Sequence, residues 1–260
     1  MNNIVLPIGK AHQRIIREQK SNDELNNNEI PVWKTINTDI SNAIVKPITR
    51  DLAKKIVEEY EWLGCMPAIS MYHFGIFYDD VCAGVTVFGK EYSENLGHWD
   101  KYNFTGRMLL LARGVCVHWA HPHSGSKLIT DSIKLLPKEY DVITATIDPA
   151  AGEIGTIYQA CNFYYVGSMR ESNPNVKDKG GKNRFAVIIN GKIYGSRAMR
   201  AKVGSQKKSE ILKIFPDAQF VTQYNKHRYF YFRGSKSNKF FLKKQVEHLI
   251  KPYPKRAISE

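Results

Sequence analysis

The chain has 260 residues, of which 43% are hydrophobic and 12% aromatic, so we expect a globular protein with a sizeable core. No closely spaced cysteine pair occurs, which argues against a zinc knuckle or a disulfide framework and favours a reducing, cytoplasmic compartment. The sequence has no apolar run of about 18 residues and no signal-peptide pattern. We therefore expect neither a membrane span nor secretion.

The formal net charge of +13 is concentrated in the last third of the chain. Residues 184–260 hold 18 Lys and Arg against 4 Asp and Glu, whereas residues 1–183 hold 20 against 21. A basic face is sometimes only solvated, but so one-sided an excess more often binds nucleic acid or another polyanion.

Periodicity predicts the elements of the first half in chain order. The polar, Asn-rich residues 18–30 predict a loose connection or surface arm. An amphipathic helix over 49–63 follows, with Thr49 as its N-cap. A hairpin over 71–89 and an apolar strand at about 108–119 come next.

The middle of the chain alternates helices and strands. A small-residue loop leads into a helix that ends near residue 136, followed by a strand over 141–148, a helix over 152–163 and a strand from residue 164. This order predicts an α/β fold with a mixed central sheet flanked by helices, and a site where the central strands end.

The basic last third predicts further strands and helices. An Asn190-Gly191 turn indicates a hairpin, and a short basic helix follows over 205–215. A strand is expected over 223–234, and a last helix begins near Lys239 and ends at Pro252.

The loop His121-Pro122-His123-Ser124-Gly125-Ser126 permits two interpretations. A helix N-terminus presents N–H groups to anions, so Ser124, Gly125, Ser126 and Lys127 are candidates for holding a phosphate or a donor group. The same serines are also suited to plain helix capping. Alternatively, His118, His121 and His123 hold a metal. We favour loop histidines that are polar or face DNA, because no carboxylate or distant histidine joins them in the sequence.

Arg113, Asp148 and Tyr158 are the catalytic candidates. Arg113 lies in an apolar strand and therefore needs a partner, either a core carboxylate such as Asp148 or a bound donor or nucleotide. Asp148 precedes Pro149 and either forms a turn or orients an amine. Tyr158 is either a core aromatic residue or a proton donor. Tyr78 and His73 on the hairpin are candidates for lining an acceptor pocket.

Residues 226–244 interleave cations with aromatic residues, a combination that suits phosphates and bases. We expect the cations to be exposed and to contact DNA, and half of the aromatic residues 229–232 to be buried. The expected DNA-binding cations are Lys226, Arg228, Arg233, Lys236, Lys239, Lys243 and Lys244.

The element order and the run IYQACNFYYVG, residues 157–167, resemble the GCN5-related N-acetyltransferase fold. In that fold the strand–loop–helix holds the coenzyme A pyrophosphate, and a tyrosine of a later helix lies near the leaving thiol. The loop departs from the family pattern, because His121, Ser124 and Ser126 stand where that pattern has Gln or Arg, Gly, and Gly or Ala. The donor therefore stays open between acetyl-coenzyme A and an aminoacyl-tRNA.

Residues 50–256, including the closing KPYPK, resemble more closely the phage Mom group of DNA-modifying proteins. The resemblance implies transfer of a carbamoylmethyl or glycyl-type group to adenine N6 of double-stranded DNA, with the base flipped out of the duplex. The reaction would take place in the cytoplasm of a host cell and would protect the DNA from restriction. It implies a polar centre and keeps iron open as a cofactor. The residues of that centre would be Tyr78, Arg113, Ser126, Asp148 and Tyr158.

We also expect three parts of the chain from its charge distribution and composition. Residues 1–45 would form an N-terminal arm or cover, 46–183 the catalytic core, and 184–260 a basic DNA-contacting part packed on that core. Two alternatives remain: an ordinary N-acetyltransferase acting on a protein or small amine, and a DNA-binding protein without catalysis.

Overall fold

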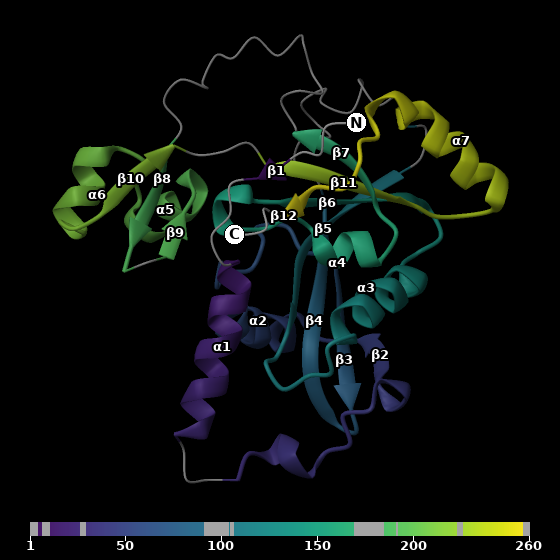
Figure 1. Ribbon diagram of the computed structural model, residues 1–260, viewed down its shortest axis with the longest axis horizontal. Coiled ribbons are helices and arrows are strands. Elements are labelled where there is room, and N and C mark those ends of the chain that lie inside the picture. The colour runs from purple at the N-terminus through teal and green to yellow at the C-terminus, as the bar shows by residue number, and fades with distance from the viewer. Residues whose placement is uncertain are drawn as a thin grey trace.

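The computed structural model describes residues 5–6, 11–26, 30–90, 104, 107–168, 185–190, 192–222 and 226–256. Its centre is a seven-stranded mixed sheet in the order β2-β3-β4-β5-β6-β11-β7 (Figure 1). The expected fold class is confirmed. The strands are β2 (Ile44–Pro47), β3 (Tyr72–Tyr78), β4 (Val81–Gly89), β5 (Arg107–Cys116), β6 (Tyr140–Ile147), β7 (Tyr164–Ser168) and β11 (His227–Phe232).

Helices cover both faces of this sheet. Helix α2 (Arg50–Tyr60) begins where Thr49 Oγ1 accepts a hydrogen bond from Leu52 N, as expected for an N-cap. It packs apolar side chains against valines of β4 and β5. Helix α3 (Ser124–Leu135) packs against the opposite face, where its Leu128, Ile129 and Ile133 enter the core.

The two central strands separate toward their carboxyl ends. β5 and β6 run parallel and pair from Arg107 with Tyr140 to Leu111 with Ala145. Beyond that point β5 continues to Cys116 beside β4, and β6 continues beside β11. Polar groups at these strand ends therefore have room to converge, as in other open α/β sheets.

A strand of the basic last third belongs to the central sheet. β11 lies between β6 and β7 and is antiparallel to both. The part proposed as 184–260 is therefore interwoven with the core. It also supplies α7 (Lys236–Val246), which packs Leu242 and Val246 against Phe230 and Phe232 of β11.

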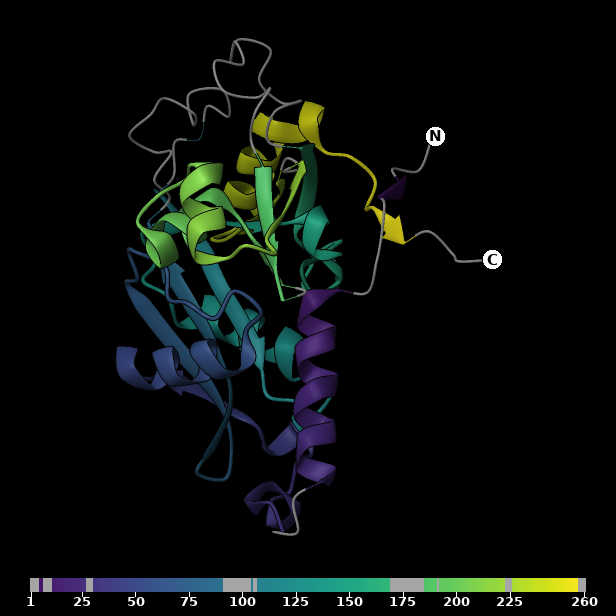
Figure 2. The ribbon, with the colours of Figure 1, turned by 90° about the vertical axis from the view of Figure 1, so that its left-hand side faces the viewer.

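A small unit of residues 185–222 has its own core (Figures 1 and 2). Its sheet has the order β10-β8-β9, and the hairpin expected at Asn190 is confirmed by the pairing of β8 with β9. In Figure 1 it lies on the opposite side of the central sheet from α7. Its elements are β8 (Phe185–Ile189), β9 (Lys192–Tyr194), β10 (Gln219–Thr222), α5 (Ser196–Val203) and α6 (Lys208–Ile214).

The expectation of a loose arm over 18–30 is wrong for most of that segment. Helix α1 (His12–Leu25) extends through it and has no buried residue. Polar side-chain contacts, not a buried apolar face, attach α1 to the rest of the protein. The sequence of α1 therefore lacks the apolar spacing from which a helix is predicted. No helix among the described residues is long and apolar enough to cross a membrane.

The helix expected over 152–163 is shorter, because Gly155 precedes it with a left-handed φ of 74°. A side chain there would meet the ring of Tyr229, since an added Cβ would lie 2.6 Å from Tyr229 Cε2. The remaining elements are α4 (Thr156–Ala160), β1 (Val5–Leu6), which pairs with β12 (Lys255–Arg256), and the 3-10 turns η1 (Val32–Thr35), η2 (Ile40–Asn42), η5 (Pro149–Ala151) and η7 (Glu247–Leu249).

Candidate active site

Arg113 turns toward the end of α2 because of a bulge in β5. Arg113 pairs with Val87 across the sheet, whereas Leu111 pairs with Phe88, so Ala112 is the extra residue. Arg113 Nε donates to the carbonyl of Cys65 at 2.8 Å. The bulge places the guanidinium on the face covered by α2, opposite to the face on which Leu111 packs.

The carboxylate facing Arg113 is Glu61, just past the last turn of α2. Glu61 Oε2 lies 3.7 Å from Arg113 Nε, and its side chain is only 8% exposed. Burial raises the pKa of Glu61 to about 7, although the Arg113 charge opposes the shift. Glu61 is therefore poised to accept or release a proton near neutral pH.

A second carboxylate, Glu153, bridges the end of β6 and the turn after α2. It accepts hydrogen bonds from Asp148 N at 2.7 Å and from Trp62 Nε1 at 3.0 Å. Burial raises the pKa of Glu153, against these two bonds and the charge of Lys226. The negative charge of Glu153 also helps to raise the pKa of Glu61, so the two carboxylates act on each other.

Tyr158 on α4 lies close enough to this pair for both carboxylates to act on it electrostatically. Its ring lies 5.4 Å from that of Phe163 and 5.5 Å from that of Tyr229. Burial, followed by the charges of Glu153 and Glu61, raises the pKa of Tyr158 far above its ordinary value. The phenol therefore keeps its proton and is suited to donate a hydrogen bond or a proton.

Helix α1 covers the same region through polar contacts. Gln13 donates to the Tyr60 carbonyl at 2.7 Å and accepts from Trp62 N at 3.1 Å. The His12 ring lies 5.3 Å from that of Trp62, and burial lowers the pKa of His12 against the opposing charge of Asp148. Arg17 donates to the carbonyls of the loop before α3, at His118 and Ala120.

The structure thus brings together three of the expected residues, Arg113, Asp148 and Tyr158, around carboxylates that the sequence analysis missed. The carboxylate partner of Arg113 is Glu61, whereas Asp148 was the example named from the sequence. Glu61 and Trp62 follow a polar helix end, and Glu153 lies in a short turn. The one sequence signal for a buried carboxylate here is the charge of Glu153 between the apolar residues Ala151 and Ile154.

Two of the expected anion-binding side chains, Ser124 and Lys127, lie in the first turn of α3 and form structural contacts there. The Ser124 hydroxyl is buried and lies 2.7 Å from the Tyr78 hydroxyl. Lys127 forms an ion pair with Asp131 at 3.2 Å. Gly125 allows α3 to approach α4, because an added Cβ would lie 3.1 Å from Ile157. The backbone N–H groups of Gly125 and Ser126 stand in the first helical turn, where intrahelical acceptors are lacking.

Tyr78 and His73 do not share a pocket. Tyr78 is fully buried beneath α3, so its side chain cannot line an acceptor pocket in this structure. His73 pairs with Val87, which packs against α2 on the opposite face of the sheet. His73 and Tyr78 are five positions apart on β3, so regular strand alternation already places their side chains on opposite faces, which the sequence analysis did not take into account.

The three candidate histidines do not converge on one point. His118 Nε2 lies 2.8 Å from Glu24 Oε2, and its ring contacts those of Trp33 and Tyr60. His121 Nδ1 accepts instead from the backbone N–H of His123. Within the described ranges no group of three His, Cys, Asp or Glu side chains is arranged to hold a metal, so these residues do not fit iron.

The basic residues of the C-terminal part divide into two groups. Arg228 is 2% exposed and donates to Thr144 Oγ1, so the expectation that it is exposed is wrong. Arg233 is half-buried and donates to the carbonyls of Leu136, Pro137 and Tyr140, which fastens β11 to the end of α3. Lys243 is half-buried, and the exposed group is Lys226, Lys236, Lys239 and Lys244.

These observations define a mixed α/β protein with a buried carboxylate–arginine cluster at the separated ends of two parallel strands. The chain belongs to the Mom protein family, which it matches over residues 42–255. It is 22% identical over 215 residues to the methylcarbamoylase mom of Escherichia phage Mu, covering 81% of this chain and 83% of that protein.

Solved acetyltransferase structures overlap with this chain at low TM-scores. A spermidine N-acetyltransferase from Vibrio cholerae, in complex with CoA and spermine, gives a TM-score of 0.40 at 10% identity, over 77% of this chain and 99% of that one. An N-acyl amino acid synthase from uncultured soil microbes gives 0.41 at 14% identity, over 78% and 97%. The strand order, rather than these overlaps, defines the fold class.

Proposed function

We propose that this protein is a DNA-modifying transferase that attaches a carbamoylmethyl or glycyl-type group to N6 of adenine. The observation that carries the proposal is the buried cluster of Glu61, Arg113, Glu153 and Tyr158 at the strand ends, in a chain of the Mom family. The name of the phage Mu relative, a methylcarbamoylase, supports the nature of the group.

The acceptor amine of adenine is paired inside a duplex, so the base must leave the helix to react. Unstacking costs a few kcal/mol. The basic last third supports this step, because exposed lysines that contact phosphates can offset that cost. Lys226, which is exposed and acts electrostatically on Glu153, is suited to hold a phosphate beside the cluster.

The transfer is a substitution at the activated carbon of the donor. The N6 nitrogen forms a bond to that carbon as the bond to the leaving group breaks, and the amine loses one proton. At the carbonyl carbon of a glycyl donor this step gives an N6-glycyl amide, whereas the isomeric carbamoylmethyl product requires a donor whose methylene carbon carries the leaving group. Glu61, with a pKa of about 7, is suited to accept that proton. Asp148 would orient the amine, Tyr158 would protonate the leaving group, and Arg113 would stabilise developing negative charge.

The donor would approach the N-terminus of α3. The N–H groups of Gly125 and Ser126 there are suited to an anionic phosphate or ester oxygen. An acetyl-coenzyme A type of thioester and an aminoacyl-tRNA both carry such anionic groups. No step of this scheme uses iron, because the described residues offer it no ligand set.

Domain roles follow the same scheme. Residues 1–45 would cover the cluster through α1, 46–183 would supply the chemistry, and 184–260 would hold the DNA. A phage-encoded protein of this kind would act in the cytoplasm of its host.

Resistance of DNA to restriction tests this function. Plasmid DNA from cells that express the protein should resist restriction enzymes that cut at adenine-containing sites, whereas an Asp148→Asn variant should yield sensitive DNA. Lys54→Gln, on the exposed side of α2, is a matched control that should retain resistance. Fully sensitive DNA from cells containing soluble, folded protein would contradict the proposal.

A further inference from the structure

Helix α7 carries an aromatic ring where an exposed helix face is normally polar. Phe240 is 68% exposed, whereas Leu242 and Val246 pack on the core side. Residues three and four positions apart are neighbours on a helix surface. Phe240 is therefore flanked by Lys236 on one side and by Lys243 and Lys244 on the other.

The charge of this face is complementary to a polyanion. α7 contains four lysines and neither Asp nor Glu. Phe241, beside Phe240, is also 52% exposed. Exposed aromatic rings among lysines combine stacking faces for bases with cations for phosphates. A second copy of this chain would instead bring lysines against lysines.

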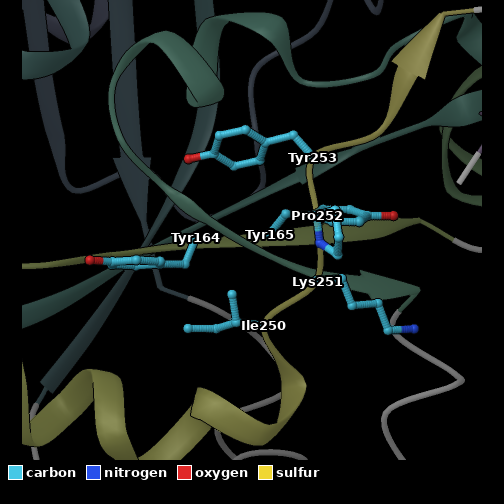
Figure 3. A pocket seen from close by; sticks show the side chains of 6 residues that line it. All are labelled: Tyr164, Tyr165, Ile250, Lys251, Pro252 and Tyr253. Atoms are coloured by element: carbon cyan, nitrogen blue, oxygen red, sulfur yellow. The ribbon is translucent and has the colours of Figure 1, made fainter. Parts of the chain in front are cut away.

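A small aromatic pocket lies next to this helix (Figure 3). Figure 3 shows the rings of Tyr164 and Tyr253 with their hydroxyls toward the same side, and Ile250 beneath Tyr164. The residues that line it are Tyr164, Tyr165, Ile250, Lys251, Pro252 and Tyr253. It is a different place from the carboxylate cluster, with which it shares no residue.

Lys243 connects the helix face to the pocket, because its Nζ lies 5.3 Å from the centre of the Tyr164 ring. On the far side, the Lys251 side chain lies along β7 over Gly167, where an added Cβ would be 2.9 Å from Lys251 Nζ. Gly167 has a φ of 79°, so backbone conformation and space both favour glycine there. The backbone of Lys251 is fixed by its bond to the Tyr165 carbonyl at 2.9 Å.

The pocket size limits its ligand. Its volume is about 170 Å³, whereas pockets for drug-sized ligands have roughly 300–1,000 Å³. One ring system fits, but a whole coenzyme does not. Ring contacts also connect the pocket to the carboxylate–arginine cluster. The ring centres of Tyr253 and Tyr229 lie 6.5 Å apart, and those of Tyr229 and Tyr158 lie 5.5 Å apart.

We propose that α7 and residues 250–253 form a binding track for unpaired nucleotides, in which Phe240 and the Tyr164–Tyr253 pocket stack bases while the lysines contact the intervening phosphates. This inference rests on the proposed function and identifies its partner as a locally opened DNA strand. An intact duplex offers no base faces to these rings, because each base is already stacked on its neighbours.

Binding of the full chain to a labelled oligothymidylate and to an intact duplex tests the track, with fluorescence anisotropy as the readout. Phe240→Ser should weaken single-strand binding about 10-fold, since one lost stacking contact costs ~1–3 kcal/mol, and should change duplex binding little. Lys244→Gln should instead lower the salt dependence, by a slope of about 0.7 for a single strand. Ile44→Ser, at another exposed apolar residue, is the matched control and should bind like the unaltered protein.

A second variant reports stacking directly. Phe240→Trp should preserve single-strand affinity, and the new indole fluorescence should be quenched when the oligonucleotide binds. Unchanged affinity of Phe240→Ser, or an equal loss on duplex and single strand, would overturn the track. If the Phe240 and Lys244 variants behave as expected while cellular DNA carries no modification, the proposed transferase function is wrong but the binding track is supported.

Discussion

The indole of Trp62 donates a hydrogen bond to the carboxylate of Glu153 over 3.0 Å and so joins the turn after α2 to the turn after β6. Trp62→Phe would leave that buried carboxylate oxygen without its donor. We expect a loss of about 1–3 kcal/mol in the free energy of unfolding, measured with urea. Trp33→Phe removes a bond to the less buried Glu24 and should cost less. An equal loss of unfolding free energy in the two variants would contradict the conclusion that Glu153 depends on its hydrogen bond more than the less buried Glu24 does.

The raised pKa of Glu61 predicts a pH dependence of stability. The native carboxyl holds its proton up to about pH 7, whereas the unfolded one releases it near its ordinary value of 4.5. Unfolding between these values therefore releases a proton, so the free energy of unfolding should fall as pH rises from 4.5 to 7. The expected fall is on the order of 3 kcal/mol.

Glu61→Gln should remove this part of the pH dependence, because an amide does not titrate. Glu58→Gln, on an exposed turn of the same helix, should leave it intact. Urea unfolding of the three proteins at several pH values measures the difference. Identical pH profiles for Glu61→Gln and the unaltered chain would show that Glu61 does not titrate in this range.

The buried pair of Tyr78 and Ser124 should behave as a structural unit. Tyr78→Phe removes the partner of the buried Ser124 hydroxyl and should cost about 1–3 kcal/mol, whereas after Ser124→Ala the Tyr78 hydroxyl keeps its backbone hydrogen bond at His121, so that this change should cost less. The double variant should cost less than the sum of the two. Folded Tyr78→Phe protein should still protect DNA from restriction. Loss of protection at unchanged stability would show that Tyr78 acts in the reaction.

Helix α1 should detach locally when Arg17 is altered. Arg17→Ala removes three hydrogen bonds to the loop before α3 from a helix that buries no side chain. We expect limited proteolysis within α1 to become several-fold faster at nearly unchanged global stability, as for a local opening. Arg14→Ala, which affects only an exposed pair with Glu18, should digest like the unaltered protein.

The sequence predicts the elements of the central sheet well where apolar periodicity and turn residues agree. Thr49 begins α2, the turn at Asp79 closes the β3–β4 hairpin, and Asn190 marks the second hairpin. The periodicity fails for α1, because polar bonds rather than an apolar face hold it. It also does not reveal that β11 inserts between β6 and β7, since pairing of distant strands leaves no local signal.

The candidate site was predictable only in part. Arg113 stands out as a charge within an apolar strand, and Asp148 as a strand end before proline. The bulge at Ala112, which turns Arg113 toward Glu61, depends on how β4 and β5 pair. Glu153 becomes notable only once folding buries it against Trp62, which lies 91 residues away.

The most direct test of the proposed function is mass spectrometry of nucleosides from the DNA of cells that express this chain, beside Asp148→Asn and Lys54→Gln variants. We predict a deoxyadenosine species heavier by one carbamoylmethyl group with the unaltered chain and Lys54→Gln, and its loss with Asp148→Asn. An acetyl-sized addition would keep adenine as acceptor and change the donor. Unmodified nucleosides from cells with soluble, folded protein would contradict the account and direct the search to protein or small-amine acceptors.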